Sequence, residues 1–362
     1  MSGKRARDWV REEILQLKAY HVAPASGMVK LDAMENPYRL PEALAAEMGE
    51  RLAQVAVNRY PDPTAASLKA SLRRAMGIPA AHAMVLGNGS DELIQMLSLA
   101  LARPDAVVLA PEPSFVMYRM SAVAAGMRYV GIPLAPDFSL DEPALMAAIA
   151  AHRPALTWIA YPNNPSGNLF PREAILRVVA ASPGLVAVDE AYYAFAGGAS
   201  LLDEVGRHPN LVLVRTVSKL GLAGLRLGLA VGPAEWIDEL EKLRPPYNVN
   251  VLTSAAAELI LGRHEVLEEQ TRRIVADRSA LEAALDRMPG VSRYPSAANF
   301  VLVRVADAPR AFEALKARGI LVRNLHGSHP HLAHCLRLTV GTADENAKLL
   351  GALAPILGPQ NA

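Results

Sequence analysis

From Thr64 onward, short apolar runs alternate with segments of helical length. The apolar runs are expected to form buried strands at 83–86, 106–110, 128–133, 157–160, 185–188, 211–214 and 227–231. Helices are expected between them, for example at 64–76, 141–152 and 171–181. An alternation of this kind is typical of a mostly parallel sheet flanked by helices. The pattern therefore predicts an α/β fold.

After residue 250 the pattern changes to a long polar helical stretch and a compact ending of mixed strands and helices. We expect helices at 253–288 (interrupted near Gly262), 309–318 and 344–355, and strands at 298–303, 320–323 and 335–340. The change predicts two domains. These are a large α/β domain of 37–250 and a small α+β domain of 251–362, which also takes in the N-terminal arm of 1–36.

The N-terminal arm contains one expected helix, at 8–18. Val10, Ile14 and Leu17 recur there at helical spacing and would form one apolar stripe on an otherwise charged segment. The arm begins with basic residues but lacks the apolar segment of a secretory signal.

Composition narrows the classes of function. Lys and Arg (37) nearly balance Asp and Glu (36), whereas a nucleic-acid-binding surface needs a concentrated basic excess. Uncharged apolar runs stay well below the ~18 residues that span a membrane. The single cysteine, Cys335, excludes an internal disulfide and fits a reducing compartment. We therefore expect a cytoplasmic protein with neither a nucleic-acid nor a membrane partner.

The segment Thr216–Gly228 carries the strongest chemical signal. It begins at the end of the apolar run 211–214 and combines Lys219 and Arg226 with three glycines. A lysine near a cation, or in apolar surroundings, has a lowered pKa and can attack carbonyl carbons as a neutral amine. Considered alone, a Ser-Lys pair of this kind is more often a surface lysine that precedes a glycine-rich turn.

Polar residues also follow three other apolar runs, at the edge of a parallel sheet where ligands bind. Residues 87–92 lead into a helix whose free N–H groups and dipole favour an anion, although Ser90 or Asp91 would also serve as an ordinary helix cap. Asp189 ends an apolar strand, where a buried carboxylate needs a charged or hydrogen-bonding partner. A helix cap or a hydrogen bond at the strand end would explain it equally well. Asn164 lies in an Asn-Asn-Pro-Ser-Gly turn, a common turn sequence.

Several histidines raise the question of a metal site. They are His21, His326, His329, His331 and His334. Apart from Cys335, no carboxylate or thiolate lies near them at metal-ligand spacing. We therefore expect no metal, interpret the histidines as surface residues, and place Cys335 inside a strand.

In their order along the chain, these segments resemble the fold-type I pyridoxal-phosphate (PLP)-dependent transferases, and in particular the aminotransferases. Ser218–Gly228 is similar to the segment that carries the cofactor lysine of this family. The resemblance implies that Lys219 binds pyridoxal 5'-phosphate covalently and later moves the substrate proton as base and acid. It also implies that Asp189 pairs with the pyridine nitrogen, while Asn164 and Tyr192 bind the phenolic oxygen.

The resemblance assigns further residues to cofactor and substrate. It implies that Phe115 stacks on the pyridine ring and that Arg337, with Asn164, binds substrate. The implied phosphate ligands are Gly89, Ser90, Asp91, Ser218 and Arg226, together with Tyr60 from the neighbouring subunit of a homodimer. Tyr20 on the N-terminal arm would close over bound substrate.

Within this group, the stretch from about Ala19 to Leu353 resembles the histidinol-phosphate aminotransferases. The motifs that carry this narrower likeness are 35–38, 59–62, 322–324 and 335–342. Two residues depart from the pattern, because Arg39 stands where glycine is usual and Phe115 where tyrosine is frequent. The resemblance implies that Arg323 and Arg337 face the anionic end of the substrate, which we expect to include a phosphate.

The narrower likeness implies amino transfer between L-histidinol phosphate and 2-oxoglutarate in histidine biosynthesis. An aromatic-amino-acid aminotransferase or a threonine-phosphate decarboxylase would share the cofactor site and remains an alternative. A non-catalytic, cofactor-binding regulator would keep the same fold, but the joint presence of Lys219, Asp189 and Arg337 argues against it.

Overall fold

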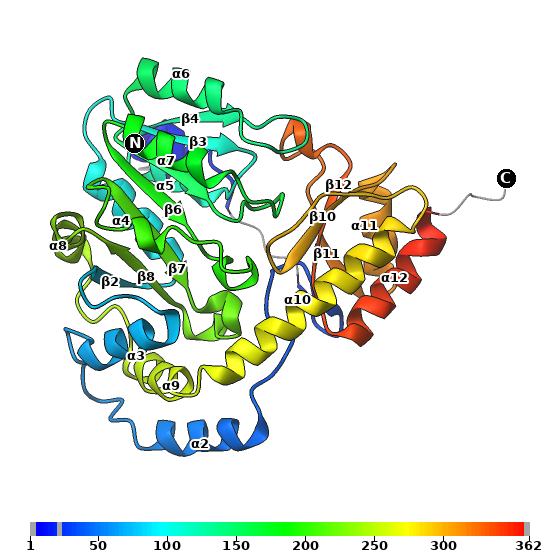
Figure 1. The fold of residues 1–362 in the computed structure, drawn as a ribbon, viewed down its shortest axis with the longest axis horizontal. Helices are drawn as coiled ribbons and strands as arrows, with labels where there is room; N and C mark the ends of the chain where they lie inside the picture. The colour runs from blue at the N-terminus through cyan, green and yellow to red at the C-terminus, as the bar shows by residue number, and fades with distance from the viewer. Residues whose placement is uncertain (1–4, 20–23, 358–362) are drawn as a thin grey trace.

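The computed structural model describes residues 5–19 and 24–357, which form two sheets and their covering helices (Figure 1). The larger sheet has seven strands in the order β2-β8-β7-β6-β5-β3-β4. Their bounds are β2 Ala83–Asn88, β3 Val107–Glu112, β4 Arg128–Pro133, β5 Leu156–Ala160, β6 Leu185–Asp189, β7 Leu211–Thr216 and β8 Leu227–Gly232. Only β8 runs against its neighbours β7 and β2. The expected mostly parallel sheet is confirmed.

Helices cover both faces of this sheet, because successive strand residues point to opposite sides. Leu109 and Val188 pack into one core with α3 (Ala66–Met76), α6 (Glu142–His152), α7 (Arg172–Ala181) and α9 (Val251–Leu261). Their neighbours Val108 and Ala187 pack into a second core with α4 (Ser90–Leu101), α5 (Met117–Ala124) and α8 (Ala234–Leu243). The central strands are therefore buried on both faces and mostly apolar, which is why the sequence shows apolar runs there.

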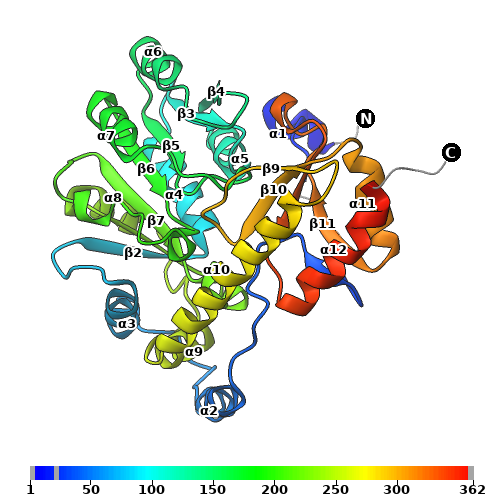
Figure 2. The same cartoon turned by 45° about the vertical axis from the view of Figure 1, so that its right-hand side comes forward.

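The smaller sheet has five strands in the order β1-β11-β12-β10-β9. Their bounds are β1 Val29–Leu31, β9 Ser292–Arg293, β10 Phe300–Arg304, β11 Ile320–Asn324 and β12 Cys335–Thr339. Helices α10 (Glu265–Asp286), α11 (Ala308–Ala317) and α12 (Ala343–Leu357) pack on it (Figure 2). Strand β1 pairs in parallel with β11, so the N-terminal part of the chain belongs to this sheet. The exact boundaries of the two domains remain a prediction.

The remaining elements are short or peripheral. Helix α2 (Glu42–Ala53) packs along α9. Short 3-10 turns are η1 Ala6–Asp8, η2 Tyr193–Phe195, η3 Leu202–Glu204, η4 Ser218–Leu220, η5 Ala223–Leu225 and η6 Pro330–Leu332. None of the helices in the described ranges is long and apolar enough to cross a membrane.

The helix expected at 8–18 is wrong in its extent. The structure has only the turn η1 and one short helix, α1 (Glu12–Leu15). The Arg11 side chain donates hydrogen bonds to the carbonyl oxygens of Val123 and Ala124 at the end of α5. The Arg11 side chain therefore attaches this segment to the large domain. Apolar packing contributes little, since the Trp9 side chain is 82% exposed.

Candidate active site

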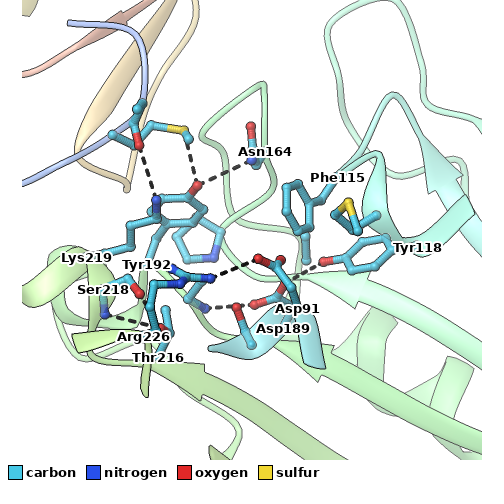
Figure 3. A pocket seen from close by; sticks show the side chains of 17 residues that line it. Asp91, Phe115, Tyr118, Asn164, Asp189, Tyr192, Thr216, Ser218, Lys219 and Arg226 are labelled. Atoms are coloured by element: carbon cyan, nitrogen blue, oxygen red, sulfur yellow. Dashed lines mark hydrogen bonds and ion pairs between the residues drawn. The ribbon is translucent and has the colours of Figure 1, made fainter. Parts of the chain in front are cut away.

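A cavity of about 400 Å³ lies where β5, β6 and β7 end and helix α4 begins. Figure 3 shows the side chains that line it. It brings together nine residues singled out from the sequence, namely Ser90, Asp91, Phe115, Asn164, Asp189, Tyr192, Ser218, Lys219 and Arg226. The cavity is also lined by Met34 and Tyr118, which the sequence analysis did not select, and by Thr216 at the start of the lysine segment.

Lys219 lies in η4, directly after β7. Its Nζ donates a hydrogen bond of 3.2 Å to the carbonyl oxygen of Ala33 and lies 5.9 Å from the centre of the Tyr192 ring. Burial and, to a smaller extent, the positive charge of Arg337 lower the pKa of Lys219 to about 8. An appreciable fraction of the amine is therefore neutral near pH 7, as a nucleophile or a base requires.

The connection between β7 and β8 holds Lys219 and Arg226 in one short turn. The backbone N–H of Val217 and the Thr216 hydroxyl both donate to the carbonyl oxygen of Leu227, which closes the turn at its base. Gly228 packs against the loop that precedes α4, and a Cβ there would lie 2.6 Å from the Ser90 nitrogen. Glycine is required at this contact because any side chain would separate the two loops.

The N-terminus of α4 forms one end of the cavity. Gly89 precedes it with a φ of 82°, and a Cβ at Gly89 would meet the Arg226 guanidinium at 2.6 Å. Arg226 forms an ion pair with Asp91 at 3.2 Å, and both side chains remain about half exposed. Free backbone N–H groups, the helix dipole and a guanidinium converge here, so this end is suited to an anion such as a phosphate.

Asp189 lies at the buried side of the cavity and is 6% exposed. Its carboxylate accepts hydrogen bonds from the Tyr118 hydroxyl (2.7 Å) and the backbone N–H of Ala191 (3.0 Å). Burial raises the pKa of Asp189 to about 6, and these two hydrogen bonds oppose the rise. Tyr118 itself stacks on Trp158 with ring centres 4.6 Å apart. Tyr118 was missed because it lies at a core position of an amphipathic helix.

Glu190 follows Asp189 but serves a different purpose. Its carboxylate faces away from the cavity and forms an ion pair with the buried guanidinium of Arg215 at 2.8 Å. It also accepts hydrogen bonds from Ser200 and from the backbone of Leu201. Alternation along an extended backbone explains why one carboxylate faces the site and the other anchors the fold.

A chain of hydrogen bonds connects the cavity to the small domain. The Asn164 amide nitrogen donates to the Tyr192 hydroxyl at 3.3 Å, and the Asn164 oxygen accepts from Arg337 at 2.6 Å. Arg337 also donates to the backbone oxygen of Asp32 at 2.9 Å, and the Tyr192 hydroxyl donates to the Met34 sulfur at 3.2 Å. Arg337 is 6% exposed, so its charge acts in a largely dry environment.

A second chamber of about 380 Å³ adjoins the first and shares Met34, Phe115 and Asn164 with it. Arg323 on β11 and Arg337 on β12 both line this chamber. The two residues face each other in the register of the small sheet, so their guanidinium groups arise from neighbouring strands. The chamber therefore combines two cations from the small domain with the Lys219 cavity of the large one.

Tyr60, which was singled out from the sequence, does not line this cavity. Tyr60 is 80% exposed and stacks on Tyr247, with ring centres 4.4 Å apart. Tyr20 lies outside the described residues. Among the histidines, His326 is exposed and His329, His331 and His334 are half-buried, so their expected surface position holds only in part. Cys335 is buried in β12, as expected.

The side chains that line the cavity provide three kinds of functional group. Lys219 offers an amine with a lowered pKa, Asp189 a buried carboxylate, and Asn164 with Tyr192 a pair of hydrogen-bonding groups. No group of three or more potential metal ligands occurs in the part of the chain that the structure describes. Such a site is equipped to bind an organic group with an anionic end and to move a proton beside it.

The sequence is similar to those of known aminotransferases. A family model described as aminotransferase class I and II matches residues 26–353. A histidinol-phosphate aminotransferase of Chromobacterium violaceum is 56% identical over 344 residues, which cover 95% of this chain and 96% of that protein. A histidinol-phosphate aminotransferase of Burkholderia lata is 53% identical, over 96% of this chain and 97% of that protein.

The fold is also similar to those of solved aminotransferase structures. A histidinol-phosphate aminotransferase from Sinorhizobium meliloti, in complex with pyridoxal-5'-phosphate, superposes with a TM-score of 0.86 at 25% identity. The match covers 96% of this chain and 97% of that one. An L-threonine-O-3-phosphate decarboxylase from Porphyromonas gingivalis has a TM-score of 0.77 at 21% identity over 91% of this chain and 99% of its own, a likeness of fold alone.

Proposed function

The chain belongs to the class I and II aminotransferase family, and from this premise we propose that it transfers the amino group of L-histidinol phosphate to 2-oxoglutarate. The products are imidazole-acetol phosphate and L-glutamate, and the reaction is a step of histidine biosynthesis. Relatives named for this activity match almost the whole chain at 50% identity and above. A cytoplasmic location is part of the proposal and rests on the single, buried cysteine.

Pyridoxal 5'-phosphate fits the cavity on grounds of chemistry. Gly89 leaves room beside Arg226 that a side chain would fill, and the N-terminus of α4 adds N–H donors for a phosphate. Lys219 provides the amine for an aldehyde, and the buried Asp189 provides a counter-charge for a ring N–H. Ser90, Asp91, Ser218 and Arg226 would hold the phosphate, Asn164 and Tyr192 the phenolic oxygen, and Phe115 the ring face.

When bound, the cofactor supplies an aldehyde that takes up the amino group and a ring that accepts the electron pair left at the substrate α-carbon. The chain's own residues do the rest. Lys219 would take the proton from the substrate α-carbon as general base and would return one as general acid. Asp189 stabilises a positive ring nitrogen, since an ionised carboxylate in a buried site acts strongly on a nearby charge. Asn164 and Tyr192 fix the ring orientation through directional hydrogen bonds.

The arginine pair is the observation that carries the choice of substrate. Histidinol phosphate carries a phosphate, whereas glutamate carries two carboxylates, so one site must accept both in turn. Planar guanidinium groups bind either oxyanion through paired hydrogen bonds. Arg337 is already oriented by Asn164 and the Asp32 carbonyl group, and Arg323 lies beside it in the register of the sheet. We assign the glutamate α-carboxylate to Arg337 and the substrate phosphate chiefly to Arg323.

A homodimer with shared active sites is also part of the proposal. The anion end of the cavity is half exposed in a single chain, since the Arg226 and Asp91 side chains are 49% and 45% exposed. Tyr60 and Tyr247 form an exposed aromatic pair, and Val57 and Leu252 add to the exposed apolar surface. Pairing of two chains through this surface would bring Tyr60 of each to the phosphate of the other. Tyr20 would close over the substrate.

The substrate assignment is tested by removing the phosphate. Wild-type enzyme is assayed with histidinol phosphate and with histidinol, and we expect kcat/KM to fall by at least roughly tenfold to a hundredfold for histidinol, since a charge-assisted contact contributes about 1.5–3 kcal/mol. Arg323→Ala should lower kcat/KM for histidinol phosphate by a similar factor and for phenylalanine much less. Arg318→Ala, at the exposed C-cap position after α11, is the matched control.

Equal kcat/KM for histidinol phosphate and histidinol would exclude a phosphate site and favour an aromatic-amino-acid aminotransferase. Release of carbon dioxide from threonine phosphate without amino transfer would favour the decarboxylase, whose fold this chain shares.

A further inference from the structure

Glu112 is the last residue of β3 and lies in the wall of the chamber that adjoins the Lys219 cavity. It takes no part in the proposed handling of the cofactor or of the phosphate. Its backbone is fixed, since the Glu112 carbonyl oxygen accepts a hydrogen bond of 2.7 Å from Leu134. The following loop is held by Asn163, whose amide donates to the Pro113 oxygen and accepts from the Ser114 hydroxyl.

The side chain of Glu112 folds back over the neighbouring strand β4. Gly131 has no side chain, and a Cβ at this position would collide with the Glu112 carboxylate. Beyond Gly131, the carboxylate accepts a hydrogen bond from the hydroxyl of Tyr129, and burial together with this carboxylate raises the pKa of Tyr129. A carboxylate has about four acceptor sites, so one bond to Tyr129 leaves capacity for another donor.

The charges around the chamber are distributed unevenly. Its cations are Lys18, Arg119, Arg323 and Arg337, whereas Glu112 is the one carboxylate among the described residues that line it. Arg119 lies over the Tyr129 ring at 5.8 Å, and His329 from the small domain is close enough for the Glu112 charge to oppose the lowering of its pKa by burial. The chamber thus offers anion-binding groups from the small domain and one anionic acceptor from the large domain.

The proposed substrate has the complementary distribution. Histidinol phosphate carries a dianion at one end and, at the other, an imidazole ring with an N–H donor. We propose that Glu112 accepts a hydrogen bond from the imidazole N–H and so determines that the side chain of the substrate is an imidazole rather than a phenyl ring. This proposal rests on the proposed function and assigns it a further, specificity-determining residue.

The simpler alternative is that Glu112 only holds Tyr129 in place. In that case its loss would disturb the chamber wall in the same way for every substrate. A recognition role predicts a selective effect, because a site built to hydrogen-bond a donor discriminates against analogues that lack it. Two phosphates that differ only in their ring therefore separate the two roles.

The experiment compares histidinol phosphate with 2-amino-3-phenylpropyl phosphate, the same molecule with phenyl in place of imidazole. Glu112→Gln keeps the size of the side chain and an acceptor for Tyr129 but removes the charge. We expect kcat/KM for histidinol phosphate to fall by roughly tenfold or more, since charged acceptors bind more strongly than neutral ones. The phenyl analogue should change by less than about twofold. Tyr129→Phe, which keeps the carboxylate, should retain most of the wild-type ratio.

Both compounds are assayed on the same enzyme sample, so the fraction of folded protein cancels in the ratio. An unchanged ratio in Glu112→Gln, or an equal loss for both compounds, would overturn the proposal. The phosphate test above judges the proposed function separately, through histidinol phosphate against histidinol. If that test fails, the ratio of histidine to phenylalanine as amino donors measures imidazole recognition without a phosphate, with the same expected loss in Glu112→Gln.

Discussion

Replacing Asp189 by asparagine should make the cofactor-free protein more stable and the loaded enzyme much less active. The substitution removes a negative charge from a side chain that is 6% exposed and leaves its shape unchanged. In the wild type, Oδ2 accepts from the Tyr118 hydroxyl and Oδ1 from the Ala191 N–H. Asparagine has one side-chain oxygen, which keeps the bond from Ala191, and its NH2 group donates to the Tyr118 hydroxyl oxygen. The contact that disappears is the one between an ionised carboxylate and a positive ring nitrogen.

The size of the effect follows from the pKa of Asp189, which burial raises from 3.8 to about 6. A folded-state pKa above the unfolded value means that this group stabilises the fold fully below pH 3.8 and that the contribution is lost as the pH rises through about 6. Above pH 6 the buried charge therefore costs about 3 kcal/mol relative to a neutral side chain, and at pH 5 about half of that.

Urea unfolding of the cofactor-free protein, followed by tryptophan fluorescence, measures this difference. Asp189→Asn should exceed wild type by about 3 kcal/mol at pH 7, and the gain should shrink toward pH 5. Asp238→Asn, an exposed aspartate on α8, is the control and should show no gain. With cofactor, the activity of Asp189→Asn should fall roughly a hundredfold or more. A variant less stable than wild type at pH 7, or a gain independent of pH, would refute the reasoning.

Three further predictions concern neighbouring groups. Lys219→Ala should abolish turnover and the yellow absorbance of the lysine-linked cofactor. Lys242→Ala, on the surface of α8, is the control and should keep both. Near-normal turnover in Lys219→Ala would contradict the assignment of Lys219. Mixed chains of inactive Tyr60→Ala and inactive Lys219→Ala should regain activity through hybrid dimers, and no recovery after verified subunit exchange would show that each chain builds its site alone. In the wild type the hydrogen bond from Tyr118 lowers the pKa of Asp189, so Tyr118→Phe should raise this pKa and shift the acid limb of the pH–activity profile to higher pH. An acid limb at the wild-type pH would contradict this role.

Much of the candidate site was predictable because it lies at strand ends. An apolar run followed by a polar residue gave Asp189, Asn164 and Lys219, since the carboxyl ends of parallel strands meet at one edge of the sheet. The structure brings these three side chains into one cavity. Their chemical roles remain predictions, because the sequence supplied them through the family resemblance and not through geometry.

The parts that the sequence did not predict depend on contacts between distant segments. Strand β1 has three residues and pairs with β11 near the other end of the chain, so no local pattern marks it. In the sequence, Tyr118 has the spacing of a core residue in an amphipathic helix. Only its hydrogen bond to Asp189 distinguishes it from other core residues. The helix expected at 8–18 is interrupted at Arg11, whose backbone is not helical (φ −55°, ψ 140°). None of the residues 8–18 is buried, so the apolar stripe gains too little packing to stabilise a longer helix.

The turn between β7 and β8 has a consequence for the order in which the site assembles. Thr216 and Leu227, which close this turn, are 11 residues apart, whereas Asn164 and Arg337 are 173 residues apart. Contacts that close short loops cost little chain entropy and form early in folding, while distant ones must wait for both partners. We therefore expect the lysine end of the site to form with the β7–β8 hairpin and the arginine end only after the small domain has docked. A chain with a damaged small domain would then still capture cofactor but would no longer recognise substrate.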